Sequence, residues 1–441
     1  MRIALLAPAG AMHRYNGNFK KSLHYAPLTL TTLAALVPQE LMAEVAIYDE
    51  TVGIIPKDIE ADLIGITAIT GTSMRAYKWA DYYRSKGITV VMGGVHPTLM
   101  PQEAAEHADC VVTGFAEQTW PRLLEDFVGG KLQKFYCQDE DLDISGRPIP
   151  RRELLNRKRY ITINSVEAIR GCNLPCSFCA FPAAFGRNLY KRPVREVIEE
   201  IEKLNSKEVL FPDVNLVADR EYAKELFREM IPLKKWWFGL TTSDVAKDSE
   251  LFDIIVKSGC RGLLIGFESF TQDSQKFVKK GINKVGEYEE LMKKLHHAGI
   301  GVNGCLAFGG DEEDRSVFER TVEAVVKLKI DLPRYSILTP FPGTQLYREF
   351  DEQDRIIENN WAMYDVEHCV FKPKNMTVEE LEEGIEWAWR ETYTFMNIAK
   401  RLSTFGTPHI ASVPANVFGY RVYADKFRQF TREVMIDNSD I

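Results

Sequence analysis

The most informative segment of this chain is Arg170-Gly171-Cys172-Asn173-Leu174-Pro175-Cys176-Ser177-Phe178-Cys179. Its cysteines have the spacing Cys-x3-Cys-x2-Cys, in a chain that has only 8 cysteines among 441 residues. Gly171 and Pro175 allow the segment to curl, so that its thiolates can converge on one metal centre. Three thiolates are one fewer than a structural zinc site or a complete four-thiolate iron–sulfur set requires. A cluster held in this way leaves one iron open to another ligand.

The same spacing also allows a zinc site that a distant histidine completes, or three small buried residues. The flanking residues favour the cluster. Arg170-Gly171 before the first cysteine and Phe178 before the last resemble the signature of the radical S-adenosylmethionine (radical SAM) enzymes. This resemblance implies that Cys172, Cys176 and Cys179 hold a catalytic [4Fe-4S] cluster whose open iron binds SAM.

Length and composition restrict the class of protein. A chain of 441 residues predicts two or three domains, and 45% hydrophobic with 27% charged residues is typical of a globular protein with a full core. The formal net charge of -8 argues against general nucleic-acid binding. No apolar run is long enough to form a transmembrane segment. Few, unevenly spaced cysteines fit a reducing compartment, so we expect a cytoplasmic protein.

Residues 1–145 alternate short apolar runs with helical segments. The expected strands are Arg2–Pro8, Glu44–Asp49, Leu63–Thr70, Ile88–Gly93 and Cys110–Gly114. The expected helices are Pro27–Leu36, Ser73–Lys86, Gln102–His107 and Thr119–Val128. Continuous apolar strands separated by helices predict a parallel sheet covered on both faces, which is a doubly wound, Rossmann-like α/β domain.

The carboxyl ends of these strands are rich in glycine, threonine and acidic residues, and ligands of such sheets bind at this edge. Four such loops on one rim predict a broad polar ledge for a large, amide-bearing ligand. Gly93-Gly94-x-His96-Pro97-Thr98 resembles the cobalamin-binding domain that precedes many radical SAM barrels. The cobalamin contacts that this resemblance implies are Asp49, Glu50, Thr51, Thr67, Thr70, Thr72, Gly93, Gly94, Val95, His96, Gly114 and Glu117.

The chain departs from one cobalamin pattern. Methionine-synthase-like domains carry an Asp-x-His-x-x-Gly motif whose histidine ligates cobalt, whereas the corresponding loop here reads Asp49-Glu50-Thr51 and has no histidine. We therefore expect cobalamin without a lower histidine ligand and with a residue of the 70–75 loop beneath cobalt. We expect His96 to pack against its own loop.

Residues 146–159 have the composition of a linker, and the strand–helix rhythm restarts at residue 160. The expected strands of residues 160–371 are Tyr160–Ile169, Glu208–Phe211, Trp236–Thr242, Gly262–Phe267, Gly301–Phe308 and Arg334–Leu338. The expected helices are Pro193–Leu204, Arg220–Met230, Ser249–Ser258, Glu287–Ala298 and Arg315–Lys329. Six repeats, where a closed barrel needs eight, predict a partial (β/α)6 barrel, which is also the radical SAM fold. The cysteine loop follows the first strand and lies on the rim where barrels carry their chemistry.

Small and polar residues recur where the later barrel strands end, and Phe178 lies in the cysteine loop. A SAM site on this rim needs groups for the sulfonium, the ribose and the adenine. The residues predicted to bind SAM are Phe178, Asp213, Asn215, Ser243, Glu268, Gly309, Gly310, Leu338 and Thr339.

Residues 372–441 are expected to form a mainly helical C-terminal region. Thr377-Val378-Glu379-Glu380 predicts a capping box at the start of a long helix. Leu381, Ile385, Ala388 and Trp389 give this helix one apolar stripe, which predicts packing against the barrel.

From residue 1 to about 400 the chain resembles the cobalamin-binding radical SAM enzymes. The resemblance implies methylation of an unactivated carbon in a small-molecule, lipid or other natural-product substrate, through a 5′-deoxyadenosyl radical and methylcobalamin. It also implies an external one-electron donor of the flavodoxin or ferredoxin type. Three alternatives stay open: cyclisation, oxidation or rearrangement with the same cofactors; a non-catalytic cobalamin or metal-binding module; and a tRNA methylthiotransferase. The last needs three N-terminal cysteines, and only Cys110 and Cys137 precede the barrel.

Overall fold

The computed structural model describes residues 1–10, 26–139, 141–403, 412–426 and 441. Parts of two predicted regions, residues 11–25 and 140 of the first domain and residues 404–411 and 427–440 of the C-terminal region, therefore lie outside the described residues.

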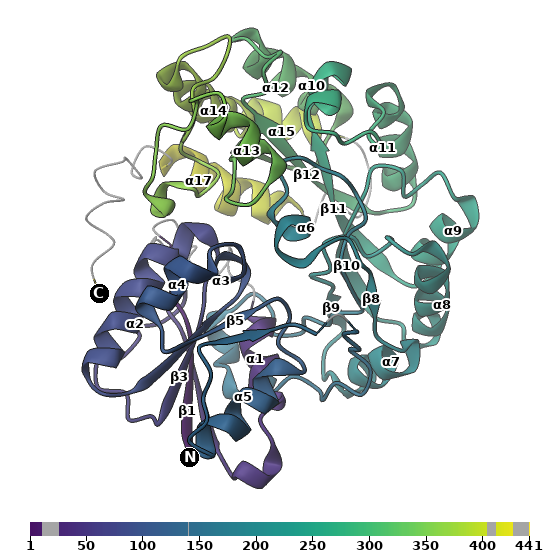
Figure 1. Cartoon of the computed structure of the whole chain (residues 1–441). Helices are drawn as coiled ribbons and strands as arrows, with labels where there is room; N and C mark the ends of the chain where they lie inside the picture. Colours follow the sequence, from purple (N-terminus) through teal and green to yellow (C-terminus); the bar gives the residue numbers. More distant parts are fainter. Residues whose placement is uncertain (11–25, 140, 404–411, 427–440) are drawn as a thin grey trace.

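The N-terminal part contains a six-stranded sheet in the order β2-β1-β3-β4-β5-β6, in which all pairs are parallel (Figure 1). Its strands are β1 (Arg2–Ala7), β2 (Glu44–Asp49), β3 (Leu63–Thr67), β4 (Thr89–Gly93), β5 (Cys110–Thr113) and β6 (Phe135–Cys137). Its helices are α1 (Leu28–Ala35), α2 (Ser73–Ser85), α3 (Val95–Leu99), α4 (Pro101–His107) and α5 (Thr119–Val128), with 3₁₀ turns at Gln39–Leu41 and Thr70–Thr72.

Both faces of this sheet are covered, which confirms the predicted doubly wound domain. Trp79 and Tyr83 of α2 pack on one face, while Leu30 of α1 and Trp120 of α5 pack on the other. The sequence pattern does not predict β6, whose three residues are too few to show a pattern, or α3, which forms where a strand-end loop is expected.

The second part contains a five-stranded parallel sheet in the order β13-β12-β11-β10-β9. Its strands are β9 (Glu208–Leu210), β10 (Trp236–Thr241), β11 (Cys260–Glu268), β12 (Gly301–Phe308) and β13 (Leu332–Ile337). Its helices are α7 (Val194–Lys203), α8 (Arg220–Met230), α9 (Ser249–Lys257), α10 (Gln272–Phe277), α11 (Tyr288–His297), α12 (Ser316–Leu328) and α13 (Gln345–Asp351). The predicted partial barrel is confirmed.

The expected first barrel strand, Tyr160–Ile169, differs from the structure. Only Ser165 forms a parallel bridge, with Leu210 of β9, and β7 (Ile169–Arg170) pairs antiparallel with β8 (Tyr190–Lys191). The physical reason is that side chains take the backbone groups that a ladder would use. Arg152 donates to the Ser165 carbonyl, and Asp213 accepts from the amides of Ala168 and Ile169. The partial barrel is therefore open on the side of β9.

The C-terminal region carries α14 (Val378–Thr392), α15 (Phe395–Arg401), a π-helical turn (Ala415–Tyr420) and α17 (Arg421–Lys426). Thr377 and Glu380 form the predicted capping box at the start of α14. The apolar stripe of α14 is buried, and the helix packs on β13 and α12. The predicted packing of this helix against the barrel is confirmed.

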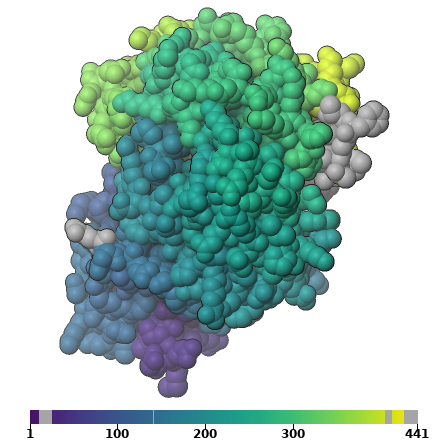
Figure 2. All heavy atoms as spheres, turned by 90° about the vertical axis from the view of Figure 1, so that its right-hand side faces the viewer, coloured from purple at the N-terminus to yellow at the C-terminus, as the bar shows by residue number. Residues whose placement is uncertain are grey.

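The two parts adjoin directly. Helix α6 (Ala180–Phe185), which starts immediately after the cysteine loop, lies between the two sheets and contacts α3 of the N-terminal domain (Figure 1). On the face shown in Figure 2, the atoms of the blue N-terminal domain and the teal barrel meet. A 3₁₀ turn at Trp361–Met363 adds a second contact, since the Trp361 indole donates to Glu103 of α4 at 3.0 Å.

Candidate active site

The cysteine loop connects β7 to α6 on the barrel rim. Gly171 has φ of +120°, and a Cβ there would lie 2.1 Å from the Asn188 carbonyl oxygen, so only glycine fits. The three thiols of the cysteine loop are free and half-buried. Cys179 is the N-cap residue of α6, and its amide donates to the Cys176 carbonyl at 3.3 Å. The local backbone thus fixes the curl that the sequence predicted.

The three thiols act on one another electrostatically. Burial raises the pKa of Cys176 to about 12, with the Lys280 ammonium opposing the rise and the neighbouring thiols adding to it. Burial also raises the pKa of Cys179. Among the described residues, no three His, Cys, Asp or Glu side chains lie close enough to hold a single metal ion. Three thiols on one loop are one fewer than structural zinc requires, so the donor set fits a cluster that leaves one iron open.

A small cavity lies beside this loop. It brings together four of the predicted SAM residues: Phe178, Glu268, Gly310 and Leu338. The other residues that line it are Ser269, Ser274, Val278, Ala307 and Glu313, which the sequence reading missed. Ser269 directly follows Glu268, and Glu313 stands three residues after Gly310. This closeness in sequence to a predicted SAM residue was the only signal that could have identified them.

Glu268 ends β11 in an unusual backbone conformation. Its φ is +60°, and the register with β12 shifts between Gly266 and Glu268. The Lys280 ammonium donates to Oε1 of Glu268 at 2.6 Å and to the Gly266 carbonyl at 3.0 Å. A Cβ at Gly266 would approach both charged groups within about 2.5 Å. Lys280, which the sequence reading did not single out, therefore fixes the carboxylate that faces the cavity.

The glycine pair after β12 is also engaged by a carboxylate. The amides of Gly309 and Gly310 donate to Oε2 of Glu313 at 2.8 and 3.1 Å, and Ser274 donates to its Oε1 at 3.1 Å. Burial raises the pKa of Glu313, although these donors oppose the rise. The backbone of this rim segment is thus fixed before any ligand binds.

The remaining predicted SAM residues lie outside the small cavity. Ser243 donates to Asn283 at 2.7 Å, and Thr339 donates to the Ile337 carbonyl at 3.0 Å. Oδ1 of Asp213 accepts from the amides of Ala168 and Ile169 at 2.9 and 2.5 Å, and burial raises its pKa to about 7. Asn215 is buried, and its Oδ1 has no hydrogen-bond partner among the described residues. Asp213 and Thr339 bind backbone groups, whereas Ser243 binds a side chain; their roles toward SAM remain predictions.

The predicted cobalamin residues are at the carboxyl ends of β2, β3, β4 and β5, on one rim of the N-terminal sheet. Gly94 has φ of +106°, and a Cβ there would lie 2.8 Å from both the Ala68 carbonyl and the Thr67 hydroxyl. Ile69 on the same rim is 53% exposed. Gly94 thus packs directly on residues 67–68, and Ile69 gives this rim one exposed apolar side chain.

Several of these side chains are bound to protein groups. Asp49 accepts from Thr51 and from the Tyr160 hydroxyl, and Glu50 forms a buried ion pair with Arg75. His96 is fully buried, as expected for a histidine that packs on its own loop. Its Nδ1 lies 3.3 Å from the Thr70 hydroxyl, and its Nε2 lies 3.5 Å from Glu103. In this arrangement His96 does not present a ring nitrogen to the rim.

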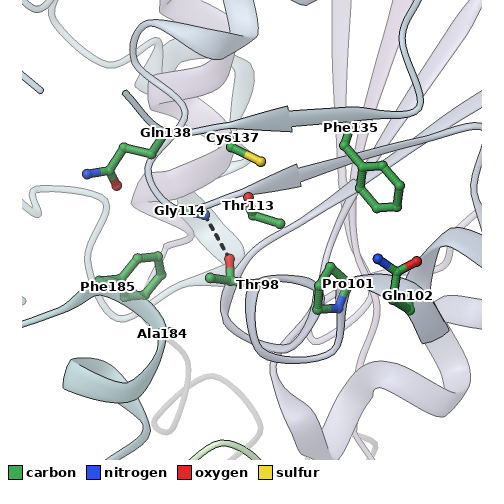
Figure 3. A pocket seen from close by; sticks show the side chains of 10 residues that line it. All are labelled: Thr98, Pro101, Gln102, Thr113, Gly114, Phe135, Cys137, Gln138, Ala184 and Phe185. Atoms are coloured by element: carbon green, nitrogen blue, oxygen red, sulfur yellow. Dashed lines mark hydrogen bonds between the residues drawn. The ribbon is translucent and has the colours of Figure 1, made fainter. Parts of the chain in front are cut away.

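A cavity of about 590 Å³ lies where the N-terminal rim meets α6 (Figure 3). Among the predicted residues only Gly114 lines it, and its amide donates to the Thr98 hydroxyl at 3.0 Å. Among the described residues no charged side chain lines this cavity; the other lining residues are Pro101, Gln102, Thr113, Phe135, Cys137, Gln138, Ala184 and Phe185. It is suited to an uncharged group with amide-bonding edges.

Comparison with known proteins agrees with this arrangement. Residues 166–325 match the Radical SAM superfamily, and residues 23–124 match the B12 binding domain. The chain is 31% identical over 388 residues to bacteriochlorophyllide d C-12(1)-methyltransferase of Chlorobaculum tepidum, covering 85% of this chain and 84% of that protein. It is 28% identical to the C-8(2)-methyltransferase of the same organism, covering 88% and 89%. The structure of the methyltransferase TsrM from Kitasatospora setae, with cobalamin and a [4Fe-4S] cluster bound, has the same fold at a TM-score of 0.65 and 18% identity, covering 99% of each chain.

The chain belongs to the cobalamin-binding radical SAM enzymes. The predicted family, fold class and enzyme class are thereby confirmed, as are the three cofactors: a [4Fe-4S] cluster, SAM and cobalamin. In the part of the chain that the structure describes, every helix is too short or too polar to cross a membrane.

Proposed function

We propose that this enzyme transfers a methyl group to an unactivated carbon of a small-molecule substrate, with a cyclic tetrapyrrole of the bacteriochlorophyllide kind as the first class to test. The observation that carries the proposal is the position of the cysteine loop. Arg170, two residues before Cys172, pairs with Glu117 of the N-terminal rim at 2.7 Å, so the cysteine loop adjoins this rim. Support for the substrate class comes from the two bacteriochlorophyllide methyltransferases, which align over most of their length.

A carbon without acidity offers no electron pair to SAM, so an ionic displacement cannot methylate it. When bound, the cofactors supply the one-electron cleavage of SAM and a transferable methyl group. The protein supplies binding, orientation and the exclusion of water. In this proposal Cys172, Cys176 and Cys179 hold the cluster, Phe178 and Leu338 form apolar walls of the SAM site, and the Glu268–Lys280 pair presents a fixed carboxylate to it.

We assign the other predicted contacts in the same way. Asp213, Asn215, Ser243 and Thr339 support the SAM site from behind its walls, and Gly309 and Gly310 allow backbone to approach SAM. The rim residues of the N-terminal sheet other than Glu117, which pairs with Arg170, bind cobalamin without a lower histidine ligand. The domain division proposed is 1–145, 146–159, 160–371 and 372–441. A flavodoxin or ferredoxin type protein supplies the electron, and a lipid-like substrate is the second class to test.

Product analysis of the anaerobically purified enzyme tests the proposal. Incubation with SAM, a reductant and bacteriochlorophyllide d should yield methylated pigment together with S-adenosylhomocysteine and 5′-deoxyadenosine. 5′-Deoxyadenosine with an altered but unmethylated pigment would instead indicate cyclisation, oxidation or rearrangement. The absence of both nucleosides with every substrate would contradict an enzymatic role.

A further inference from the structure

One loop of the N-terminal domain contacts both ends of the cysteine loop. Residues 115–117 follow β5, and Glu117 among them is a predicted cobalamin contact. Oε1 of Glu117 accepts from Nη1 of Arg170 at 2.7 Å, two residues before Cys172. The Phe115 ring stacks on Phe185 of α6, with ring centroids 4.3 Å apart and planes within 5°. The cysteine loop is therefore held at its entry and its exit by one segment of the other domain.

The contact at the entry is a buried ion network. The Arg170 guanidinium also pairs with Glu167 through Nε at 3.0 Å and Nη2 at 2.6 Å. Arg147 reaches the same Glu167 carboxylate at 2.6 Å. The Arg170 and Glu117 side chains are only 13% and 7% exposed. Because a buried charge without its partners is strongly destabilising, the Arg170 guanidinium is held in this network.

The contact at the exit is aromatic. Phe115 also lies near Phe181 of α6 and Tyr190 of β8, with ring centroids 6.2 and 5.7 Å away. The Arg170 guanidinium lies 4.4 Å above the Phe115 ring, so the ionic and aromatic contacts share one residue. Since α6 begins directly after Cys179, Phe115 contacts side chains on both flanks of the cysteine loop.

The same loop is tied to the cobalamin rim through its backbone. The Thr98 hydroxyl donates to the Gly94 carbonyl at 2.7 Å and accepts from the Gly114 amide at 3.0 Å. The Phe115 amide donates to Gln138 at 2.8 Å. A continuous path of hydrogen bonds and packed rings thus runs from the Gly94 rim to the cysteine loop.

We propose that residues 115–117 form a coupling loop that orders the cysteine loop when cobalamin occupies the rim, with Phe115, Glu117 and Arg170 as positioning residues. The inference rests on the proposed function only in requiring cobalamin at this rim. A ligand that rigidifies the ends of β4 and β5 lowers the cost of ordering whatever is packed against them. The predicted role of Glu117 changes from a contact with cobalamin to a contact with Arg170.

Amide hydrogen exchange of residues 172–186 tests the coupling, with and without hydroxocobalamin, in the cluster-reconstituted full chain under anaerobic conditions. Ser177 and Gly186 have hydrogen-bonded amides in this window and report its order. In the wild type, hydroxocobalamin should slow this exchange by at least about fivefold, within the usual range of coupling between sites. In Glu117→Gln the slowing should disappear, while the absorption bands show the same cobalamin occupancy.

Two further variants keep the outcome decisive. Phe115→Leu retains apolar volume but loses the ring stacking, and it should also lose the slowing. Glu153→Gln removes an exposed ion pair with Arg151 and should behave as the wild type. Unchanged exchange in wild type with bound cobalamin, or full slowing in Glu117→Gln, would overturn the inference. Loss of cobalamin binding in Glu117→Gln would overturn it too, because Glu117 would then contact cobalamin. A wild type without cobalamin bands would overturn the proposed function itself.

Discussion

The two rims of this enzyme are built in different ways. On the barrel, the groups that face the small cavity are fixed by buried side chains: Lys280 holds Glu268, and Glu313 holds the Gly309–Gly310 amides. On the N-terminal sheet, the rim depends on backbone geometry at Gly94 and leaves Ile69 exposed. Each rim therefore suits a different kind of ligand. A small charged ligand needs preset partners, whereas a large ligand with many amides needs open backbone and room.

The largest expected effect comes from the barrel rim. Replacing Cys172, Cys176 or Cys179 by alanine should abolish cluster retention and SAM cleavage, since three thiolates are the minimum set here. The measurement is iron content and 5′-deoxyadenosine formation under anaerobic conditions. Cys137→Ala, at an exposed cysteine, is the matched control and should keep both. An alanine variant of one of these three cysteines that retains iron and cleaves SAM at the wild-type rate would contradict the assignment of the cluster to this loop.

The second effect concerns pH and Asp213. Burial raises the pKa of this carboxyl from 3.8 to about 7, so the folded protein favours its protonated form. Its stabilising contribution is complete below about pH 4 and is lost as the pH rises to 7; at 1.36 kcal/mol per unit the loss amounts to about 4 kcal/mol. Asp213→Asn mimics the protonated form and should not show this loss.

Denaturant unfolding of the wild type and Asp213→Asn between pH 4 and 8 measures the difference. The free energies of unfolding should diverge with rising pH in favour of the variant. Parallel pH profiles would mean that the two amide donors keep Asp213 ionised throughout.

The third effect tests the N-terminal rim alone. Gly94→Ala places a Cβ 2.8 Å from the Ala68 carbonyl in a backbone region with positive φ. The strain should cost about 1–3 kcal/mol of stability and displace the rim. Absorption spectra should show the iron–sulfur shoulder without cobalamin bands. Gly130 has φ of +68° and nothing within 4 Å of an added Cβ, so Gly130→Ala should retain cobalamin. Joint loss of both cofactors in Gly94→Ala would mean that the rims are not separable.

The smallest expected effect concerns the N-terminal cap of α14, which lies at neither rim. Thr377→Ala removes the hydroxyl that caps α14 and should lower stability by about 1 kcal/mol. Thermal unfolding measures the change, and cofactor content should remain at the wild-type level. A loss of SAM cleavage larger than the loss of folded protein would show that α14 takes part in the site.

The sequence predicted most of the fold, because apolar runs and helix periodicity are local signals. β2, β12, α5 and α8 begin and end at the expected residues. The expected strand 160–169 does not form, because Arg152 and Asp213 bind its backbone groups. Asp213 is distant in sequence, and Arg152 lies in the linker 146–159. Such long-range polar contacts leave no periodic pattern.

The site was predicted to the same degree. The cysteine spacing located the cluster loop, and strand ends located four residues of the small cavity. Lys280 and Glu313 were missed because neither stands at a strand end. Glu117 was found as a rim residue, but the partner that gives it its contact, Arg170, comes from the other domain. Pairing across an interface cannot be read from spacing along one chain.

The irregular segment 160–169 also bears on how the chain folds. Tyr160 donates to Asp49, and the Thr162 carbonyl accepts from the Ala26 amide, so this segment takes partners from the N-terminal domain. During synthesis the N-terminal domain leaves the ribosome first and can fold before the barrel strands are complete. The start of the barrel then docks on a surface that already exists. Refolding of the isolated barrel should therefore be slower than refolding of the full chain, because the partners of residues 160 and 162 would be absent.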